Sequence, residues 1–217
     1  VTPPDNLLSQ VQATFTYLKE SEKRAADTTG ISLAYRDWSG QPMNPVEQQD
    51  ADEFLSVLME RLEERLKPTP QKSLLKDIFG GQTCNQLICQ ECGFKSERQE
   101  DFFVIPLDIK GKASILESLE LYVEGEVLDG DNKFRCQACN EKRDTLKRQC
   151  FQSLPNTLIL HLKRFDFDLE LYRKVKINDL CAFPTQLDMR PFTKEALEEK
   201  DAAKHANAVG ANDSASD

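Results

Sequence analysis

The chain has 217 residues, 39% of them hydrophobic, which is enough to bury a sizeable core as one large domain or two small ones. Its formal net charge is −9 with only two histidines, which argues against a nucleic-acid surface, where a basic patch is expected. No apolar run is long enough to span a bilayer. We therefore expect a soluble protein of the cytoplasm or nucleus that engages neither membranes nor nucleic acid.

The N-terminal part is expected to be helical. An amphipathic helix from about Asp5 to Arg24 carries one apolar stripe, made of Leu7, Leu8, Val11, Phe15 and Leu18. Residues 25–43 lose this period and contain glycines and a proline, which indicates a connecting loop with at most a short turn of helix. Asn44 then predicts an N-cap followed by Pro45 in the first turn, and the helix that it opens ends before Pro68.

The pattern changes to period 2 beyond Gly81, which predicts strands. We expect strands near residues 103–109, 146–151, 158–165 and 174–178, and a short helix over residues 114–122. After Thr193 the aromatic residues vanish, and Ala, Lys, Glu, Asn and Ser dominate. Residues 194–217 are therefore predicted to be a polar flexible tail or linker.

Two cysteine pairs dominate the middle of the chain. Cys89 and Cys92 form one C-x-x-C pair, Cys136 and Cys139 form the other, and 43 residues separate the pairs. This spacing lets four thiolates reach one tetrahedral Zn²⁺, which then needs no further ligand and is structural. Gly93 and Asn140 follow the pairs and suit tight turns of positive φ, so each pair is expected at the tip of a hairpin.

Two disulfides, or four buried thiols, are the competing interpretation of these cysteines. The regular spacing and the lack of a signal peptide favour the metal site, because disulfides persist in oxidising compartments. The other cysteines, Cys84, Cys150 and Cys181, are isolated in the sequence. Three unpaired thiols also fit a reducing compartment.

The order of the motifs resembles one family, the ubiquitin-specific proteases, which are papain-like cysteine deubiquitinases. Residues 48–54, QQDADEF, resemble their Q-Q-D-x-x-E-F segment, and residues 154–165, LPNTLILHLKRF, are similar to the L-P-x-x-L-x-x-x-L-K-R-F strand of their palm. The two C-x-x-C pairs match the zinc-bearing fingers of the family. The match continues through three short segments, Lys176-Ile177-Asn178, Phe183-Pro184 and Leu187-Asp188-Met189.

The resemblance implies an α+β fold of papain-like, ubiquitin-specific protease type. Residues 1–70 would form part of a helical thumb, residues 71–155 the fingers with adjoining palm elements, and residues 156–193 the palm strands. The implied activity is hydrolysis of the (iso)peptide bond after the last glycine of ubiquitin by a Cys-His-Asp/Asn triad. Ubiquitin and ubiquitinated proteins would be the partners, and Zn²⁺ the structural cofactor.

The sequence departs from the family at the catalytic positions. The family's nucleophile lies in a box resembling G-x-x-N-x-x-N-T-C-Y and its histidine in a G-H-Y box, and this sequence contains neither. We therefore assign no catalytic residue. The stretch is expected to be the interior of a longer protease, truncated at both ends; alternatively, the boxes were never present and the protein is a ubiquitin-binding pseudo-enzyme. A zinc-ribbon interaction module unrelated to ubiquitin is a third, less favoured hypothesis.

Three residues are candidates for contacts with ubiquitin. Asp50 matches the family position suited to the arginines of the ubiquitin tail, and Glu53 lies one turn further on. An acidic residue in the first turn of a helix is also favoured by the helix dipole alone. Phe165 resembles the aromatic residue that flanks the tail channel, yet it could equally be ordinary core.

Overall fold

The computed structural model describes residues 6–44, 46, 50–170 and 172–213, in which the chain divides into two compact units. The first unit is Val1–Asp77 and the second is Ile78–Asp217. Within the described ranges, no helix combines the length and the apolar character needed to cross a membrane. The expected fingers and palm, residues 71–155 and 156–193, both fall largely in the second unit, and the division between them stays a prediction.

The first unit is helical, as predicted. Asn6 caps its first helix by accepting a hydrogen bond from the backbone N–H of Ser9 at 3.2 Å. The expected apolar stripe is only partly buried, because Phe15 and Leu18 remain 65% and 53% exposed. The helices are α1 (Leu7–Glu20), α2 (Thr29–Ala34) and α3 (Ala51–Leu66).

The predicted start of the third helix at Asn44 is wrong. Helix α3 begins after Asp50, whose Oδ1 accepts a hydrogen bond from the backbone N–H of Asp52 at 2.9 Å. Asn44 instead closes a local turn, since its Oδ1 accepts from the backbone N–H of Val46 at 3.1 Å. Pro45 lies outside the described residues. The helix ends at Leu66, before Pro68, as expected.

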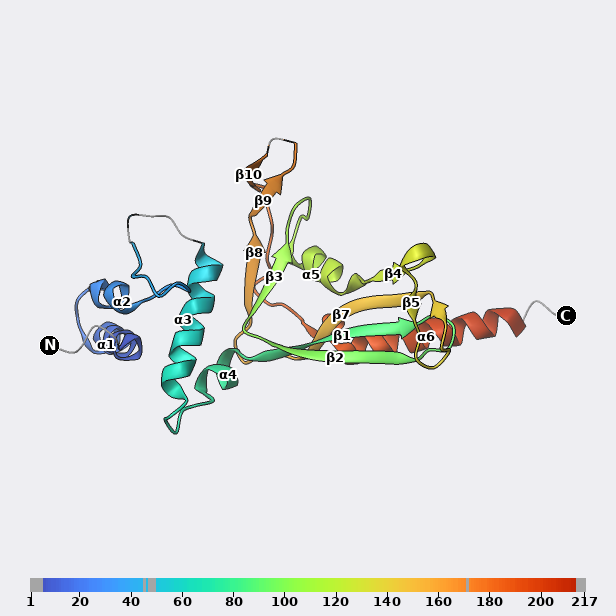
Figure 1. Ribbon diagram of the computed structural model, residues 1–217, viewed down its shortest axis with the longest axis horizontal. Helices are drawn as coiled ribbons and strands as arrows, with labels where there is room; N and C mark the ends of the chain where they lie inside the picture. The colour runs from blue at the N-terminus through green and yellow to red at the C-terminus, as the bar shows by residue number, and fades with distance from the viewer. Residues whose placement is uncertain (1–5, 45, 47–49, 171, 214–217) are drawn as a thin grey trace. The chain divides into compact units, whose positions relative to one another are not determined.

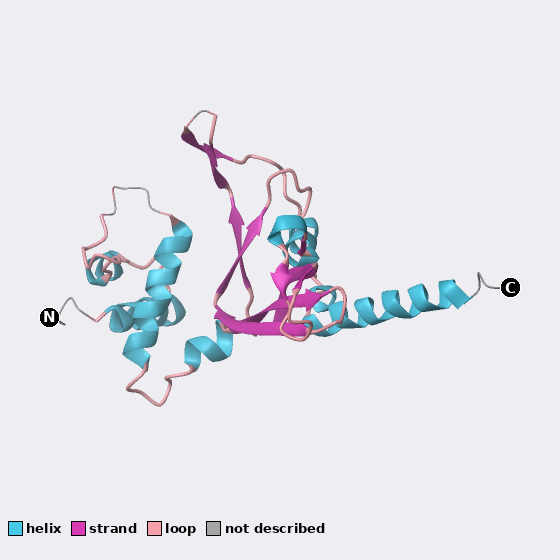
Figure 2. Cartoon of the chain, turned by 45° about the vertical axis from the view of Figure 1, so that its right-hand side comes forward, coloured by secondary structure: helices cyan, strands magenta, loops and turns pink. Residues whose placement is uncertain are grey.

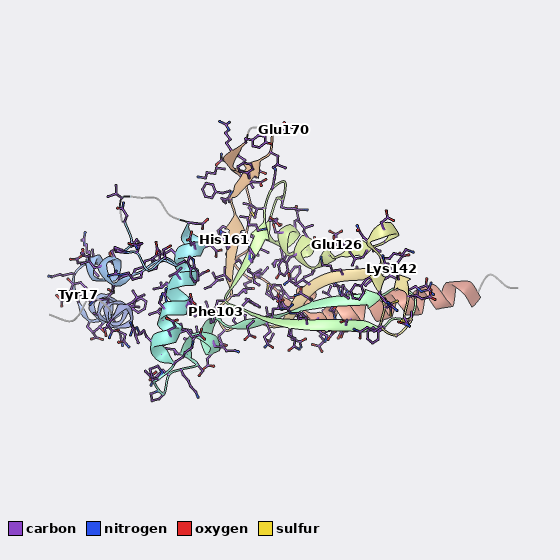
Figure 3. All side chains as sticks on the ribbon, viewed as in Figure 1. Tyr17, Phe103, Glu126, Lys142, His161 and Glu170 are labelled. Atoms are coloured by element: carbon purple, nitrogen blue, oxygen red, sulfur yellow. The ribbon has the colours of Figure 1, made fainter. Side chains whose placement is uncertain are left out.

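The second unit is built on an antiparallel sheet with the strand order β2-β1-β7-β4 (Figure 1). The other strands in the described residues form a parallel pair, β3 and β8, and two short hairpins, β5-β6 and β9-β10. Figure 3 labels Glu170 at the tip of the β9-β10 hairpin. The strands are β1 (Gly81–Cys89), β2 (Lys95–Phe102), β3 (Val104–Asp108), β4 (Glu126–Leu128), β5 (Phe134–Arg135), β6 (Lys142–Arg143), β7 (Thr145–Ser153), β8 (Ile159–Lys163), β9 (Phe165–Asp168) and β10 (Arg173–Lys176). Helix α4 (Leu74–Phe79) spans the boundary between the units, and η1 (Gly130–Asn132) and η2 (Arg190–Phe192) are 3₁₀ turns.

Helix α5 (Ile115–Glu124) and the sheet enclose the main core of this unit. The fully buried ring of Phe151 on β7 stacks on Tyr122 of α5, with ring centroids 5.5 Å apart, and meets Phe102 of β2 edge-on at 5.9 Å. Ser114 caps α5 as its Oγ accepts from the backbone N–H of Glu117 at 3.3 Å. The short helix predicted for residues 114–122 is thus confirmed.

The expected polar tail is corrected by helix α6 (Lys194–Asp213), which continues the chain after η2 (Figure 2). Leu197 is buried in the core cluster that also contains Phe151, and Ala196 is buried beside it in the helix. Lys194 Nζ donates to Glu97 Oε2 of β2 at 2.6 Å. Buried apolar contacts and ion pairs with the sheet therefore hold a segment whose composition suggested a linker.

Helices α5 and α6 cover opposite faces of the sheet. Gln86 and Arg148 lie opposite each other in the β1-β7 register, and both contact acidic side chains of α6. Phe151 lies three residues from Arg148 and therefore points to the other face, where α5 packs. The central strands β1 and β7 are thus covered on both faces, whereas β2 is mostly exposed.

Candidate metal centre

The structure brings the four predicted cysteines together at the hairpin tips. The Sγ atoms of Cys89, Cys92, Cys136 and Cys139 all lie within 4.8 Å of one another. Cys89 ends β1 and Cys92 lies in the turn before β2, whereas the other pair lies between β5 and β6. Figure 3 labels Lys142, which opens β6 directly after the second turn.

The two turns have the same backbone hydrogen bonds. In the first, the N–H of Cys89 donates to Phe94 O and the N–H of Gly93 donates to Cys89 O, each at 3.0 Å. In the second, the N–H of Cys136 donates to Glu141 O and the N–H of Asn140 donates to Cys136 O, each at 2.9 Å.

A left-handed residue lets each turn reverse within this short span. Gly93 has a φ of 69° and Asn140 a φ of 58°, as the sequence predicted. Gly and Asn are the residues that adopt this conformation at least cost. The backbone conformation of each turn thus places its two thiols close together.

The geometry fits a tetrahedral ion held by four thiolates. With Zn–S bonds of about 2.3 Å, neighbouring sulfurs in a tetrahedron would lie roughly 3.8 Å apart. The Sγ atoms of Cys92 and Cys136 are 3.6 Å apart, which requires almost no rearrangement. The backbone N–H of Cys139 donates to Cys136 Sγ at 3.5 Å and is the main cause of a pKa lowered to about 7 for that thiol, whereas the neighbouring thiols raise the pKa of Cys139 to about 12. The fit to an ion therefore rests on the positions of the four sulfur atoms.

Contacts between the two turns support the cluster from outside. Arg143 on β6 contacts Glu141 at 2.9 Å in the second turn and Glu91 at 3.9 Å in the first. The backbone N–H of Gln90 donates to Asp144 O at 2.9 Å. A four-sulfur site leaves no open position on an ion, so the arrangement can cross-link the hairpins but not bind a substrate.

The remaining thiols have the properties of core residues. Cys84 and Cys150 face each other across β1 and β7, both fully buried, and Cys150 Sγ donates to Cys84 O at 3.5 Å. Burial raises the pKa of both thiols, that of Cys150 to about 12. Cys181 is buried in a smaller cluster with Ile109 and Ile115. A nucleophilic cysteine needs a lowered pKa and an accessible sulfur; Cys84 and Cys150 have neither, and the sulfur of Cys181 lies in a buried residue.

The three candidates for ubiquitin contacts are all exposed. Asp50 and Glu53 lie at the start of α3 in the first unit, and Phe165 opens β9 in the second. Asp50 is the N-cap, so a capping role exists for it whatever else it binds. Phe165 is 62% exposed, which is incompatible with the ordinary core position that was its alternative.

Two features of the structure were missed from the sequence. Asp50 can accept a hydrogen bond from the first turn of a helix, and Glu53 follows three residues later. This spacing is the signature of a capping box and could have located the start of α3. The buried pair of Gln86 and Arg148 carries no local signal, because its partners on α6 come more than 50 residues later. Gln48 and Gln49, which the family motif contains, lie outside the described residues.

Comparisons with known proteins agree with the motifs. The sequence model of the family described as ubiquitin carboxyl-terminal hydrolase matches residues 2–206. The chain is 40% identical over 191 residues to the probable ubiquitin carboxyl-terminal hydrolase FAF of Drosophila melanogaster, covering 88% of the chain and 7% of the relative. It is 35% identical over 210 residues to ubiquitin carboxyl-terminal hydrolase 24 of Mus musculus, covering 97% and 8%. The chain therefore spans less than a tenth of the length of these curated relatives.

The fold has a solved counterpart in the SAGA Ubp8/Sgf11/Sus1/Sgf73 DUB module bound to ubiquitin aldehyde. The match has a TM-score of 0.73 at 24% identity and covers 89% of this chain and 45% of the other. It confirms the predicted α+β fold of ubiquitin-specific protease type. Since the family model spans nearly the whole chain, the chain belongs to the ubiquitin carboxyl-terminal hydrolase family.

Proposed function

We propose that the chain is part of a deubiquitinating cysteine protease that hydrolyses the (iso)peptide bond after the C-terminal glycine of ubiquitin. The observation that carries the proposal is the four-cysteine cluster at two hairpin tips in a member of this family. The share of this chain is to bind and orient ubiquitin through its helical and sheet elements. Its partners are ubiquitin and ubiquitinated proteins of the cytoplasm or nucleus.

The cofactor in this proposal is a structural Zn²⁺ held by Cys89, Cys92, Cys136 and Cys139. When bound, the ion cross-links the β1-β2 and β5-β6 hairpins and stabilises the arm that they form. Metal analysis of freshly purified protein, never exposed to chelator, tests the assignment. A single zinc ion per chain is expected, and protein without zinc would refute the site.

Asp50, Glu53 and Phe165 are the residues proposed to contact ubiquitin. The carboxylates would accept charge-assisted hydrogen bonds from arginines of the ubiquitin tail, and the exposed ring of Phe165 would offer ubiquitin an apolar contact. Asp50→Asn is a clean test, because Asn caps a helix as well as Asp and removes only the charge. We expect weaker ubiquitin binding at unchanged thermal stability. Asp50→Ala, which also removes the cap, should lower both.

The hydrolysis itself requires a cysteine thiol whose proton a histidine accepts, which leaves the thiolate. That thiolate attacks the carbonyl carbon of the last glycine, the C–N bond breaks as the amine leaves with the proton from the histidine, and water then releases free ubiquitin from the thioester. The buried thiols Cys84 and Cys150, whose pKa burial raises, are unsuited to this role. Neither Cys84 nor Cys150 is therefore the proposed nucleophile. No catalytic residue is assigned in this stretch.

Hydrolysis of a ubiquitin C-terminal fluorogenic substrate tests the proposal, with the natural full-length protein assayed beside the 217-residue chain. Activity in the full-length protein alone supports a protease whose nucleophile lies outside this stretch. The properties of the thiols also favour a second candidate, a pseudo-deubiquitinase scaffold. In that case neither form turns over, but both bind ubiquitin in calorimetry. If neither form binds nor hydrolyses ubiquitin, both candidates fail.

A further inference from the structure

A small basic cavity in the first unit has no place in the proposed function. It has a volume of about 330 Å³, and its wall combines apolar and small residues with three arginines and one carboxylate. The charged residues are Arg36, Arg61, Arg65 and Glu64, so the wall carries more positive than negative charge. Such a concentration stands out in a chain whose formal net charge is −9.

Two different elements supply the arginines. Arg61 and Arg65 are four residues apart on α3 and therefore lie on one face of the helix, where like charges repel. Arg36 comes from the segment after α2, held in place by a β-bridge to Pro42 and by hydrogen bonds from its Nη1 to Leu33 O at 2.6 Å and Tyr35 O at 2.8 Å. The fold thus brings a third cation to a pair that already repels.

Arg61 is incompletely satisfied by the protein. Its Nη1 lies 3.4 Å from Glu64 Oε2, and its Nη2 donates to Asp37 O at 3.5 Å, which are both long contacts. Its side chain is 33% exposed, but the Nε atom is buried and has no hydrogen-bond partner among the described residues. A buried donor without an acceptor is destabilising, so this site favours a ligand that supplies oxygen atoms.

We propose that this cavity binds a phosphate group, either as free inorganic phosphate or as a phosphate monoester. Guanidinium groups match the tetrahedral oxygens of phosphate in a forked geometry, and a dianion would offset the excess positive charge. The volume lies at the lower end of the range of about 300–1,000 Å³ found for ligand sites. It therefore suits one small anionic group. The inference stands apart from ubiquitin binding and does not depend on it.

Titration of the 217-residue chain with inorganic phosphate tests the proposal, with chloride at matched ionic strength as the reference. We expect phosphate, but not chloride, to raise Tm in a saturable way and to give a binding isotherm in calorimetry. Arg61→Gln should weaken binding at least tenfold. Arg98→Gln is the matched control, because Arg98 lies on β2 in the second unit and is highly exposed; it should leave binding unchanged.

Glu64→Gln provides a test in the opposite direction. It removes the only carboxylate of the cavity wall, so phosphate should bind more tightly, a result that no loss of folding can imitate. A parallel titration with O-phosphoserine distinguishes the sources: tighter binding of the ester indicates a phosphorylated side chain, and tighter binding of the free ion indicates inorganic phosphate. Equal Tm shifts in phosphate and chloride, or no change in affinity on Glu64→Gln, would overturn the assignment.

Discussion

The docking of α6 on the sheet depends on a buried guanidinium, and Asp201→Ala tests it. The side chain of Arg148 is only 4% exposed; its Nε donates to Gln86 Oε1 at 2.8 Å and its Nη2 lies 2.8 Å from Asp201 Oδ2. Gln86 is itself fully buried and donates from Nε2 to Glu97 Oε1 at 2.8 Å. Removing Asp201 leaves a charge between sheet and helix without its carboxylate.

The cost can be bounded from the exposure of the two partners. Breaking a fully buried ion pair costs about 3–5 kcal/mol, because one charge stays desolvated. The Asp201 side chain is 32% exposed, so water can replace part of what the carboxylate provides. We therefore expect a loss of about 1–2 kcal/mol in the free energy of unfolding. At about 2–4 °C per kcal/mol for a chain of this size, Tm should fall by roughly 2–8 °C.

Thermal unfolding followed by circular dichroism measures this change. Glu199→Ala is the matched control, since it removes one carboxylate from the same helix. Its partner Arg190 lies 3.6 Å away, and both side chains are well exposed, so the effect should be small. If the two variants lower Tm equally, the buried pair does not hold α6, and the account of the helix given above is wrong.

Three further predictions concern other parts of the second unit. Cys136→Ser should release the metal, seen as loss of zinc by elemental analysis, while the far-ultraviolet signal of the helices stays near that of the parent. Gly125→Ala should lower the free energy of unfolding by at least about 1 kcal/mol more than Gly111→Ala in denaturant titrations. Both glycines have positive φ, but of the two only Gly125 has no room for a Cβ, which would lie 2.6 Å from Arg148 Cβ. The hydrogen bond from Lys194 holds the pKa of Glu97 below its ordinary value of 4.5. The ionised carboxylate of Glu97 therefore contributes to the free energy of unfolding above pH 4.5, and this contribution is lost as pH falls through the lower pKa of the folded state. Glu97→Gln should therefore flatten the acid limb of a plot of Tm against pH, and an unchanged limb would contradict this assignment.

The elements predicted correctly are those whose signal is local. Ile105, Leu107 and Ile109 alternate in the sequence and are all buried, so the strand near them could be predicted from period alone. Positive φ at Gly93 and Asn140 followed from residue type. The meeting of the four cysteines followed from spacing and the chemistry of thiolates, because a shared ion is the common reason for two such pairs.

The start of α3 was misplaced although Asp50 and Glu53 carry a local signal, whereas the error in the C-terminal segment arose where distant residues decide the structure. Helix α6 is rich in Ala, Glu and Lys, which are strong helix formers, but such a composition also describes a linker. Its sheet partners, among them Lys95 for Glu198 at 2.6 Å and Arg148 for Asp201 at 2.8 Å, lie more than 50 residues earlier and give no local sign. In α1 the stripe was identified correctly, yet periodicity alone could not reveal that Phe15 and Leu18 stay exposed.

The pairing of β1 with β7 also has a consequence for synthesis of the chain on the ribosome. Cys84 and Cys150 are partners 66 residues apart, so at about 5–20 residues per second β1 waits roughly 3–13 s for its central neighbour to emerge. During that interval only β2 can pair with it. The β2 sequence, KSERQEDF, places charges along the outer edge of this early hairpin, and charged edges discourage pairing with other chains. The outer edge of β2 is therefore of the kind that discourages pairing with other chains, in the early hairpin as in the complete sheet.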